Sequence, residues 1–187
     1  VAAHNGLGAA HVSMFANEAQ KQRYLVPLAQ GVKLAAWALT EPGSGSDAAA
    51  MRTTAVKEGD CWVLNGSKMF ITHGTSADTL VIMAVTDKSA GKRGISAFIV
   101  ETSAPGYVVA RIEEKLGQHA SDTAQILFEN CRVPARNLIG DEGAGYKIAL
   151  SGLEGGRIGI AAQSVGMARA AYEAALKYAQ ERVAFGK

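Results

Sequence analysis

The sequence predicts a protein of the α+β class, in which a central β-domain is flanked by helical regions, and three regimes of hydrophobic pattern predict it. Residues 1–35 have the apolar spacing of helices. From Leu34 to about Arg136, short apolar runs are separated by turns rich in glycine, serine and charge, which is typical of strands. From Gly145 onward, apolar residues recur with the 3.6-residue period of a helix.

The N-terminal region carries the start and stop signals of a helix. Asn17 followed by Gln20 resembles a capping box, in which side chains and backbone N–H groups satisfy one another. We expect Pro27 to interrupt the helix that begins there, because proline lacks a backbone N–H group. Gly31 then provides a stop.

The central region contains about eight short runs with the character of strands. Strands at this spacing imply a closed barrel or a sandwich rather than β-α-β units. Asn65-Gly66 separates two of the runs and is first of all a hairpin signal. Cys61 and Cys131 lie inside such runs and are expected to be buried free thiols rather than a disulfide. The clearest runs are Lys33–Leu39, Thr53–Lys57, Trp62–Leu64, Met69–Ile71, Leu80–Val85, Ile95–Val100 and Ile126–Phe128.

The C-terminal region is predicted to be one long helix. Its many alanines allow other helices to approach closely. The apolar stripe of this helix needs covering, so we expect partner helices from chain beyond Lys187 or from another subunit. The stripe consists of Ile158, Ala162, Val165, Ala168, Tyr172, Leu176, Ala179 and Val183.

The composition excludes several functional classes. Of the 187 residues, 48% are apolar and 19% are charged, which is too hydrophobic for a disordered chain. The net charge of +2 gives no electrostatic basis for binding nucleic acid. The longest aliphatic run, Leu80–Val85, is far shorter than the ~20 residues that span a bilayer, so no transmembrane segment is expected. The four histidines lack partners at metal-ligand spacing, so no metal site is expected either.

The segment Trp37–Asp47 joins an apolar strand to a loop rich in glycine, hydroxyl and carboxylate groups. Gly43 and Gly45 permit turns and the close approach of a ligand to the backbone, while Thr40 and Ser46 can donate hydrogen bonds. The loop lacks the lysine of a phosphate-binding P-loop and the spacing of a dinucleotide-binding loop. These residues alone support a structural loop and a ligand-binding loop equally.

Two further segments are unusual. Phe70-Ile71-Thr72 followed by His73-Gly74 predicts an aromatic strand end before a turn. The segment Leu153–Gly159 places several glycines in a helix, where each costs about 1 kcal/mol relative to alanine. Either a bulky group approaches the helix there or the helix bends.

Taken together, these segments resemble the acyl-CoA dehydrogenase family of flavoproteins. The resemblance is specific because separate motifs occur in the family's order over essentially the whole chain, and residues 4–31 are similar to the end of the family's N-terminal helical domain. The motifs are Leu39–Asp47, Phe70–Thr72, Lys115–Gln118 with Ala120–Thr123, Val133-Pro134, Gly152–Glu154 with Gly156-Arg157, and Arg182 with Phe185-Gly186.

The resemblance implies a fold in which a middle antiparallel β-barrel domain is flanked by parts of two helical domains. Residues 1–33 would be the end of the N-terminal helical domain, 34–140 the middle β-domain, and 141–187 the first helical region of a C-terminal helical bundle. Val1 and Lys187 then look like cuts through a larger protein.

The resemblance also implies an FAD site between the middle and C-terminal domains. Thr72 would bond near N5 of the flavin, and Ser46 would also face the acyl-CoA thioester. Two distant residues, Arg182 and Phe185, would approach the FAD of a partner subunit. The implied cofactor-binding residues are Trp37, Ala38, Leu39, Thr40, Gly45, Ser46, Phe70, Ile71, Thr72, Arg182 and Phe185, and the implied substrate-binding residues are Ser46, Glu154 and Arg157.

The implied reaction is the α,β-dehydrogenation of an acyl-CoA thioester. In the family, a carboxylate removes the α-proton while the β-hydride passes to the flavin. Family members place that carboxylate either late in the C-terminal domain or immediately before Arg157, and here the second position is Gly156, which cannot act as a base. The catalytic base is therefore expected beyond Lys187, and none in this chain. This distribution resembles the short- and medium-chain, straight-chain branch of the family.

Two residues depart from the family's pattern. Phe70 stands where tryptophan is frequent, which preserves ring stacking. His119 replaces a frequent arginine, which removes a fixed charge and leaves a titratable group.

The family resemblance further implies an electron-transferring flavoprotein as electron acceptor and a homo-oligomer, either a dimer or a tetramer. Independently of the resemblance, the two expected free thiols favour an interior compartment, either a bacterial cytoplasm or a mitochondrial matrix. The alternatives are an acyl-CoA oxidase or a flavin monooxygenase on the same scaffold, or a non-catalytic fragment that binds flavin or acyl-CoA.

Overall fold

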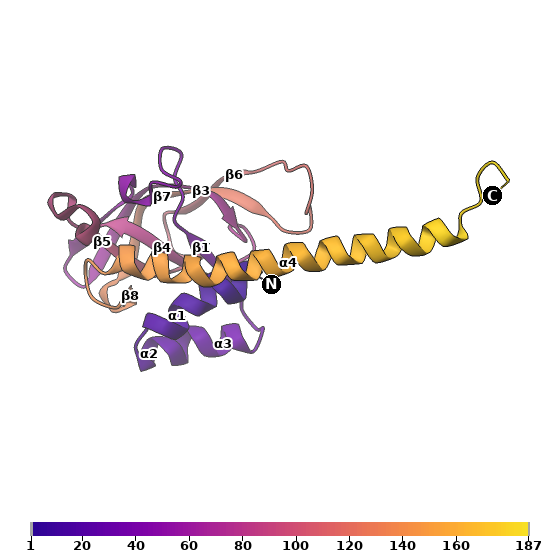
Figure 1. Ribbon diagram of the computed structural model, residues 1–187. Helices are drawn as coiled ribbons and strands as arrows, with labels where there is room; N and C mark the ends of the chain where they lie inside the picture. The colour runs from indigo at the N-terminus through magenta and orange to yellow at the C-terminus, as the bar shows by residue number, and fades with distance from the viewer. Residues whose placement is uncertain (1, 187) are drawn as a thin grey trace.

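The computed structural model, which describes residues 2–186, has the predicted α+β architecture (Figure 1). Short helices at the N-terminus pack beside an eight-stranded sheet, and one long C-terminal helix crosses the body and continues beyond it. The N-terminal helical elements are a π-helical segment His4–Ala9, α1 (Ala10–Phe15), α2 (Glu18–Gln20), a π-helical segment Lys21–Leu25 and α3 (Val26–Ala29).

The predicted capping box and glycine stop are both confirmed. Asn17 Oδ1 accepts a hydrogen bond from the Gln20 backbone N–H at 2.9 Å, and Gln20 Oε1 accepts one from the Asn17 N–H at 3.0 Å. The last helical residue is Ala29, and Gly31 follows with a φ of 69°. This left-handed conformation suits glycine because it has no Cβ.

The predicted interruption at Pro27 is wrong. Pro27 lies in the first turn of α3, directly after the π-helical segment Lys21–Leu25. A proline in the first turn of a helix costs little, because its missing N–H group would have no helical partner there. The change of helical type therefore lets the chain continue to Ala29.

The sheet has the strand order β6-β7-β3-β2-β4-β5-β8, with β1 paired to β4 outside that path. Short 3-10 turns lie at Ala48–Ala50, Lys88–Gly94 and Ala135–Asn137. The strands are β1 (Ala35–Ala38), β2 (Thr54–Glu58), β3 (Cys61–Thr72), β4 (Thr79–Val85), β5 (Ile95–Glu101), β6 (Tyr107–Ile112), β7 (Thr123–Pro134) and β8 (Leu138–Ile139).

The sheet of the expected β-domain is mixed rather than antiparallel throughout. β1 runs parallel to β4, with Ala35 opposite Thr79, and β2 meets β4 through one parallel pair. The remaining pairings are antiparallel. Parallel neighbours need a long connection, and here β2 and β3 lie between β1 and β4 in the chain.

β4 and β5 are buried on both faces, which explains why each is an unbroken apolar run. One face packs against β3 and β7, and the other packs against the N-terminal helices and the start of the C-terminal helix. The first core includes Trp62, Leu64, Leu80, Ile82, Phe98, Ile126 and Phe128. The second includes Val12, Tyr24, Val81, Met83, Ile99, Ile139 and Ile148.

The predicted hairpin at Asn65-Gly66 is also wrong, because β3 runs straight through both residues. Gly66 has a φ of 150°, and a Cβ at this position would lie 2.5 Å from Thr53 Oγ1. Glycine is thus needed here so that the chain entering β2 can approach β3 closely.

The two cysteines are free, with Cys131 buried and Cys61 half-buried.

Helix α4 (Gly145–Glu181) is continuous through its glycines. The close approach occurs at Gly152, where a Cβ would collide with the His11 ring, whereas Gly155 and Gly159 face open space. From Glu154 onward almost every side chain is exposed, and Figure 1 shows this part leaving the body of the protein. None of the helices within residues 2–186 combines the length and apolar character needed to cross a membrane.

Candidate functional site

A hollow of about 160 Å³ lies where the N-terminal helix, the end of β1 and the end of β3 meet. Its lining is mainly aromatic and aliphatic, with two threonine hydroxyls among these groups. The lining residues are Ala3, Leu7, Trp37, Leu39, Thr40, Phe70, Ile71 and Thr72. Six of them, from Trp37 to Thr72, are residues that the sequence predicted to bind the cofactor, and the fold brings them together.

The β3 wall of the hollow is shaped by an irregularity in the sheet. β3 pairs with β7 from Gly66 to Lys68 and again from Ile71, but the register shifts between Lys68 and Ile71. In that gap the Met69 backbone N–H donates a hydrogen bond of 2.8 Å to the Thr40 carbonyl, which joins β3 to the end of β1. Such irregularities redirect side chains, and here the one affected is Phe70.

Phe70 has a strained backbone and an exposed aromatic ring. Its φ is 59°, in the left-handed region that bulky residues rarely adopt, and 58% of the residue is exposed. Strain of this kind costs on the order of 1–3 kcal/mol and is concentrated at binding sites. A large ring held at the rim of a hollow can provide a flat apolar surface for a ligand.

Trp37 is supported from behind by His11. The two rings stack with centroids 5.5 Å apart, and His11 Nδ1 contacts the Leu7 carbonyl. His11 is fully buried, and this burial lowers its pKa. The His11 ring fills the space between Trp37 and Gly152 on α4.

The loop after β1 is closed by a buried carboxylate. Glu41 accepts backbone hydrogen bonds from Arg52 at 2.6 Å and from Thr53 at 3.0 Å, so it holds the far end of its own loop. Glu41 and Ser44 also exchange backbone hydrogen bonds. On the other side, Glu41 pairs with Lys68 of β3 at 2.8 Å.

The turn after Thr72 is held by Asp122. Its carboxylate accepts hydrogen bonds from the Thr75 backbone and hydroxyl and from the Ser76 hydroxyl. Burial alone raises the pKa of Asp122, but these hydrogen bonds outweigh it and lower the pKa to about 2. His73, with a φ of 63°, lies 3.7 Å from the same carboxylate. The segment that follows the candidate site is therefore anchored by hydrogen bonds to Asp122, the residue directly before β7.

The other predicted site residues lie outside this hollow. Ala38 is fully buried in the core, and Gly45 and Ser46 are exposed on the loop after Glu41. The predicted residues of α4 and the segment after it are exposed and spread along a direction that leads away from the body: Glu154, Arg157, Arg182 and Phe185.

Several residues around the hollow were not anticipated. Lys68 would be expected at a surface because it is a lysine, and His11 carries no motif. Leu7 comes from a helix whose position against the sheet cannot be inferred locally. The one available signal for Lys68 was its place between two predicted strands, two residues before Phe70.

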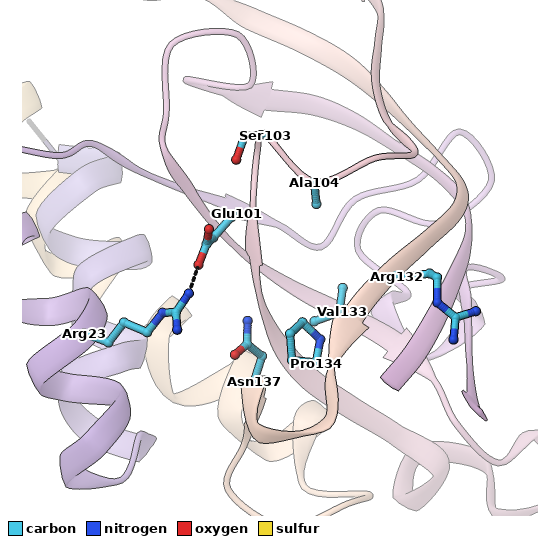
Figure 2. Close-up of a pocket in the computed structure, with 8 residues that line it drawn as sticks. All are labelled: Arg23, Glu101, Ser103, Ala104, Arg132, Val133, Pro134 and Asn137. Atoms are coloured by element: carbon cyan, nitrogen blue, oxygen red, sulfur yellow. Dashed lines mark hydrogen bonds and ion pairs between the residues drawn. The ribbon is translucent and has the colours of Figure 1, made fainter. Parts of the chain in front are cut away.

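A second hollow of about 130 Å³ lies between the N-terminal helices and the far side of the sheet (Figure 2). Arg23 reaches across it to Glu101 at 2.7 Å, and Tyr24 donates hydrogen bonds to Glu101 and Asn137. Its other arginine, Arg132, pairs with Glu58. Because these charges are paired, we interpret this hollow as part of the interface between the N-terminal helices and the sheet.

Comparison with known proteins matches two family models to the chain. The family model described as acyl-CoA dehydrogenase, middle domain, matches residues 36–131, and the one described as acyl-CoA dehydrogenase, C-terminal domain, matches residues 143–187. The short-chain specific acyl-CoA dehydrogenase of Clostridium acetobutylicum is 50% identical over 187 residues, which are 100% of this chain and 49% of that protein.

Solved structures give the same result for the fold. Butyryl-CoA dehydrogenase from Megasphaera elsdenii superposes with a TM-score of 0.96 at 48% identity, over 100% of this chain and 49% of that chain. A chain from a structure described as the electron transferring flavoprotein of Acidaminococcus fermentans gives a TM-score of 0.97 at 53% identity, again over 100% and 49%. The present chain thus spans about half the length of the curated relatives it matches.

Proposed function

We propose, from the premise that this chain belongs to the acyl-CoA dehydrogenase family, that the full-length protein is an FAD-dependent dehydrogenase of straight, short acyl-CoA thioesters. The observation that carries the proposal is the hollow at the ends of β1 and β3, because it gathers six side chains that the family resemblance implies for the flavin. The similarity at 50% identity to a short-chain specific relative supports the substrate class.

The chemistry of the hollow suits the ring system of FAD. Trp37, Leu39 and Phe70 offer apolar surface to a flat aromatic ring, and the hydroxyls of Thr40 and Thr72 offer hydrogen bonds to its polar edge. Cofactor sites commonly combine predominantly apolar walls with a few placed polar groups. When bound, FAD supplies the oxidant, because its ring system accepts two electrons.

In this proposal, the residues of this chain bind and orient FAD and the thioester, and they transfer no proton. Thr40 and Thr72 would donate hydrogen bonds to FAD, while the Phe70 ring and its apolar neighbours would exclude water from the faces of the flavin ring. Ser46 extends this role to the thioester, because the exposed loop after Glu41 leaves its hydroxyl free to turn toward a ligand. Gly156 has no side chain that could act as a base. The catalytic carboxylate therefore belongs to the part of the protein beyond residue 187.

The remaining predicted roles fall on α4. Glu154 and Arg157 follow Gly152 along the helix, where their exposed side chains would contact substrate. Arg182 and Phe185, at the far end, would reach the FAD of a second subunit in a homo-oligomer. An electron-transferring flavoprotein is the proposed acceptor, a choice supported by the description of one similar structure. The boundaries at 33–34 and 140–141 remain proposed domain limits.

Anaerobic reduction of the flavin tests this function. The full-length protein is loaded with FAD and mixed, without oxygen, with straight-chain acyl-CoAs of graded length. We expect the visible flavin band to bleach with short chains. The absence of bleaching by every acyl-CoA would refute the dehydrogenase. Rapid return of the band when oxygen is admitted would instead favour the oxidase or monooxygenase alternatives.

A further inference from the structure

The most unusual buried group outside the lining of the hollow is the ammonium of Lys68. The side chain of Lys68 is 0% exposed and that of its partner Glu41 is 6% exposed, with 2.8 Å between Nζ and Oε1. Elsewhere on the same sheet, Arg132 and Glu58 form a pair at 2.9 Å with side chains 56% and 54% exposed. Lysine and glutamate are rarely buried so completely unless they are paired.

Lys68 ties β3 to the end of β1. Its ammonium donates a second hydrogen bond, of 3.1 Å, to the Leu39 carbonyl. The next residue, Met69, donates its backbone N–H to the next carbonyl, that of Thr40. Lys68 and Met69, which are consecutive in β3, thus donate hydrogen bonds to the carbonyls of two consecutive residues at the end of β1. Leu39 and Thr40 belong to the β1 side of the lining, and Phe70, the residue after Met69, belongs to the β3 side.

Glu41 connects the same point to a third segment. Besides Lys68, its carboxylate accepts the backbone N–H groups of Arg52 and Thr53. The Thr53 carbonyl in turn accepts the Val85 N–H at 2.8 Å, so the contact continues into β4. One ion pair therefore joins the end of β1, the return of its loop and the irregular part of β3.

Stability alone does not explain such a pair. Removing two charges from water costs several kcal/mol per ion, and apolar residues of similar size are often as stable or more so. Burial lowers the pKa of Lys68 to about 8, despite the opposing effect of Glu41. Burial also raises the pKa of Glu41, but Lys68 and the backbone N–H groups more than offset this and leave it lowered. What the pair offers instead is geometry, because its hydrogen bonds have fixed directions.

We propose that Lys68 and Glu41 are positioning residues that set the separation between the β1 and β3 walls of the hollow, and so control how tightly FAD binds. The inference rests on the proposed function. It adds a requirement in residues that do not line the hollow, and it predicts that cofactor affinity depends on this pair beyond its effect on folding.

The test compares three variants of the full-length protein. Lys68→Met leaves the Glu41 carboxylate buried without its cation, so it should lower both stability and FAD affinity. The double variant Glu41→Gln with Lys68→Met has no unpaired charge, while the amide oxygen that replaces the carboxylate still accepts a backbone hydrogen bond. It should recover thermal stability in the apo form but still bind FAD about tenfold more weakly, because the Leu39 carbonyl has lost its tether. Arg132→Gln is the matched control for an exposed pair and should change neither property.

The readouts are the dissociation constant for FAD, the visible flavin spectrum, and hydrogen exchange at the Met69 amide in the apo protein. We expect faster exchange at Met69 in both Lys68 variants and wild-type exchange in the control. Recovery of FAD affinity together with stability in the double variant would overturn the proposal, because the pair would then serve folding only. Failure of the double variant to fold would overturn it for the same reason.

The two proposals fail separately. If the wild-type protein does not bind FAD, the proposed function is wrong and this inference falls with it. If the wild type binds FAD and the double variant binds it equally well, the inference alone is wrong.

Discussion

The sheet and the outer part of α4 differ in how completely their apolar side chains are packed against the rest of the molecule. The sheet encloses two cores of its own, and six predicted cofactor residues converge on one hollow at its edge. The outer part of α4, from Glu154 onward, leaves large apolar residues such as Ile158, Val165 and Tyr172 exposed. The difference teaches that the hollow on the sheet is formed within residues 2–186, whereas the outer part of α4 has almost no packing against the rest of these described residues.

A pair of glycine substitutions within α4 should separate the two regions most strongly. A Cβ at Gly145 would lie 2.5 Å from the backbone carbonyl carbon of Ser96 in β5, whereas one at Gly166 would meet nothing within 4 Å. Gly145→Ala should lower the free energy of unfolding by about 3 kcal/mol, because the backbone of a core strand cannot move aside. Gly166→Ala should raise it by up to about 1 kcal/mol through helix propensity.

Urea unfolding of the 187-residue chain measures both effects. Equal losses in the two variants would break the comparison, since α4 would then be packed along its whole length. A loss for Gly166→Ala in the full-length protein alone would sharpen it, by showing that further helices cover that position.

Asp122, which holds the turn after Thr72, offers a pH-dependent test of the region around the hollow. Its pKa is about 2 in the folded protein and ~3.9 in an unfolded chain. A lowered carboxyl pKa adds stability that is complete above about pH 4 and is lost as the pH falls toward 2. Asp122→Asn should therefore cost about 1–2 kcal/mol at pH 7 and flatten the acid limb of the stability curve. An acid limb identical to that of the wild type would contradict this assignment.

The smallest effect is expected on the outer part of α4. Arg169 and Glu173 form an exposed pair at 2.7 Å one helical turn apart. Because solvent screens such pairs, Glu173→Ala should change the unfolding free energy by less than about 0.5 kcal/mol. Thermal unfolding of the variant and wild type in parallel measures this, and a loss above about 1 kcal/mol in the full-length protein would show that the pair is buried there.

The local pattern predicted the elements better than their arrangement. The unbroken run Leu80–Val85 correctly indicated a strand buried on both faces, because burial on both sides leaves no polar alternation. The parallel pairing of β1 with β4 could not be inferred, since it joins segments far apart in the chain. Pro27 could end a helix or begin one, and the π-helical segment before it decides that the helix continues. Gly66 could form a turn or admit a close neighbour, and the position of Thr53 decides for the second.

The sequence predicted the residues that line the candidate site but not the buried residues that support them. Motif resemblance identified Thr40, Phe70 and Thr72, which face the hollow. Lys68 and His11 escaped notice because their role comes from burial, and burial depends on which strands and helices meet behind them.

The affinity of the full-length protein for FAD after substitution of Phe70 tests the central claim most directly. Phe70→Ala removes the exposed ring from the rim, whereas Phe70→Trp keeps an aromatic face in the same place. We predict that Phe70→Ala weakens FAD binding about tenfold and shifts the visible flavin spectrum, while Phe70→Trp binds within about threefold of the wild type. Wild-type affinity and spectrum in Phe70→Ala would contradict the assignment of this hollow to the flavin.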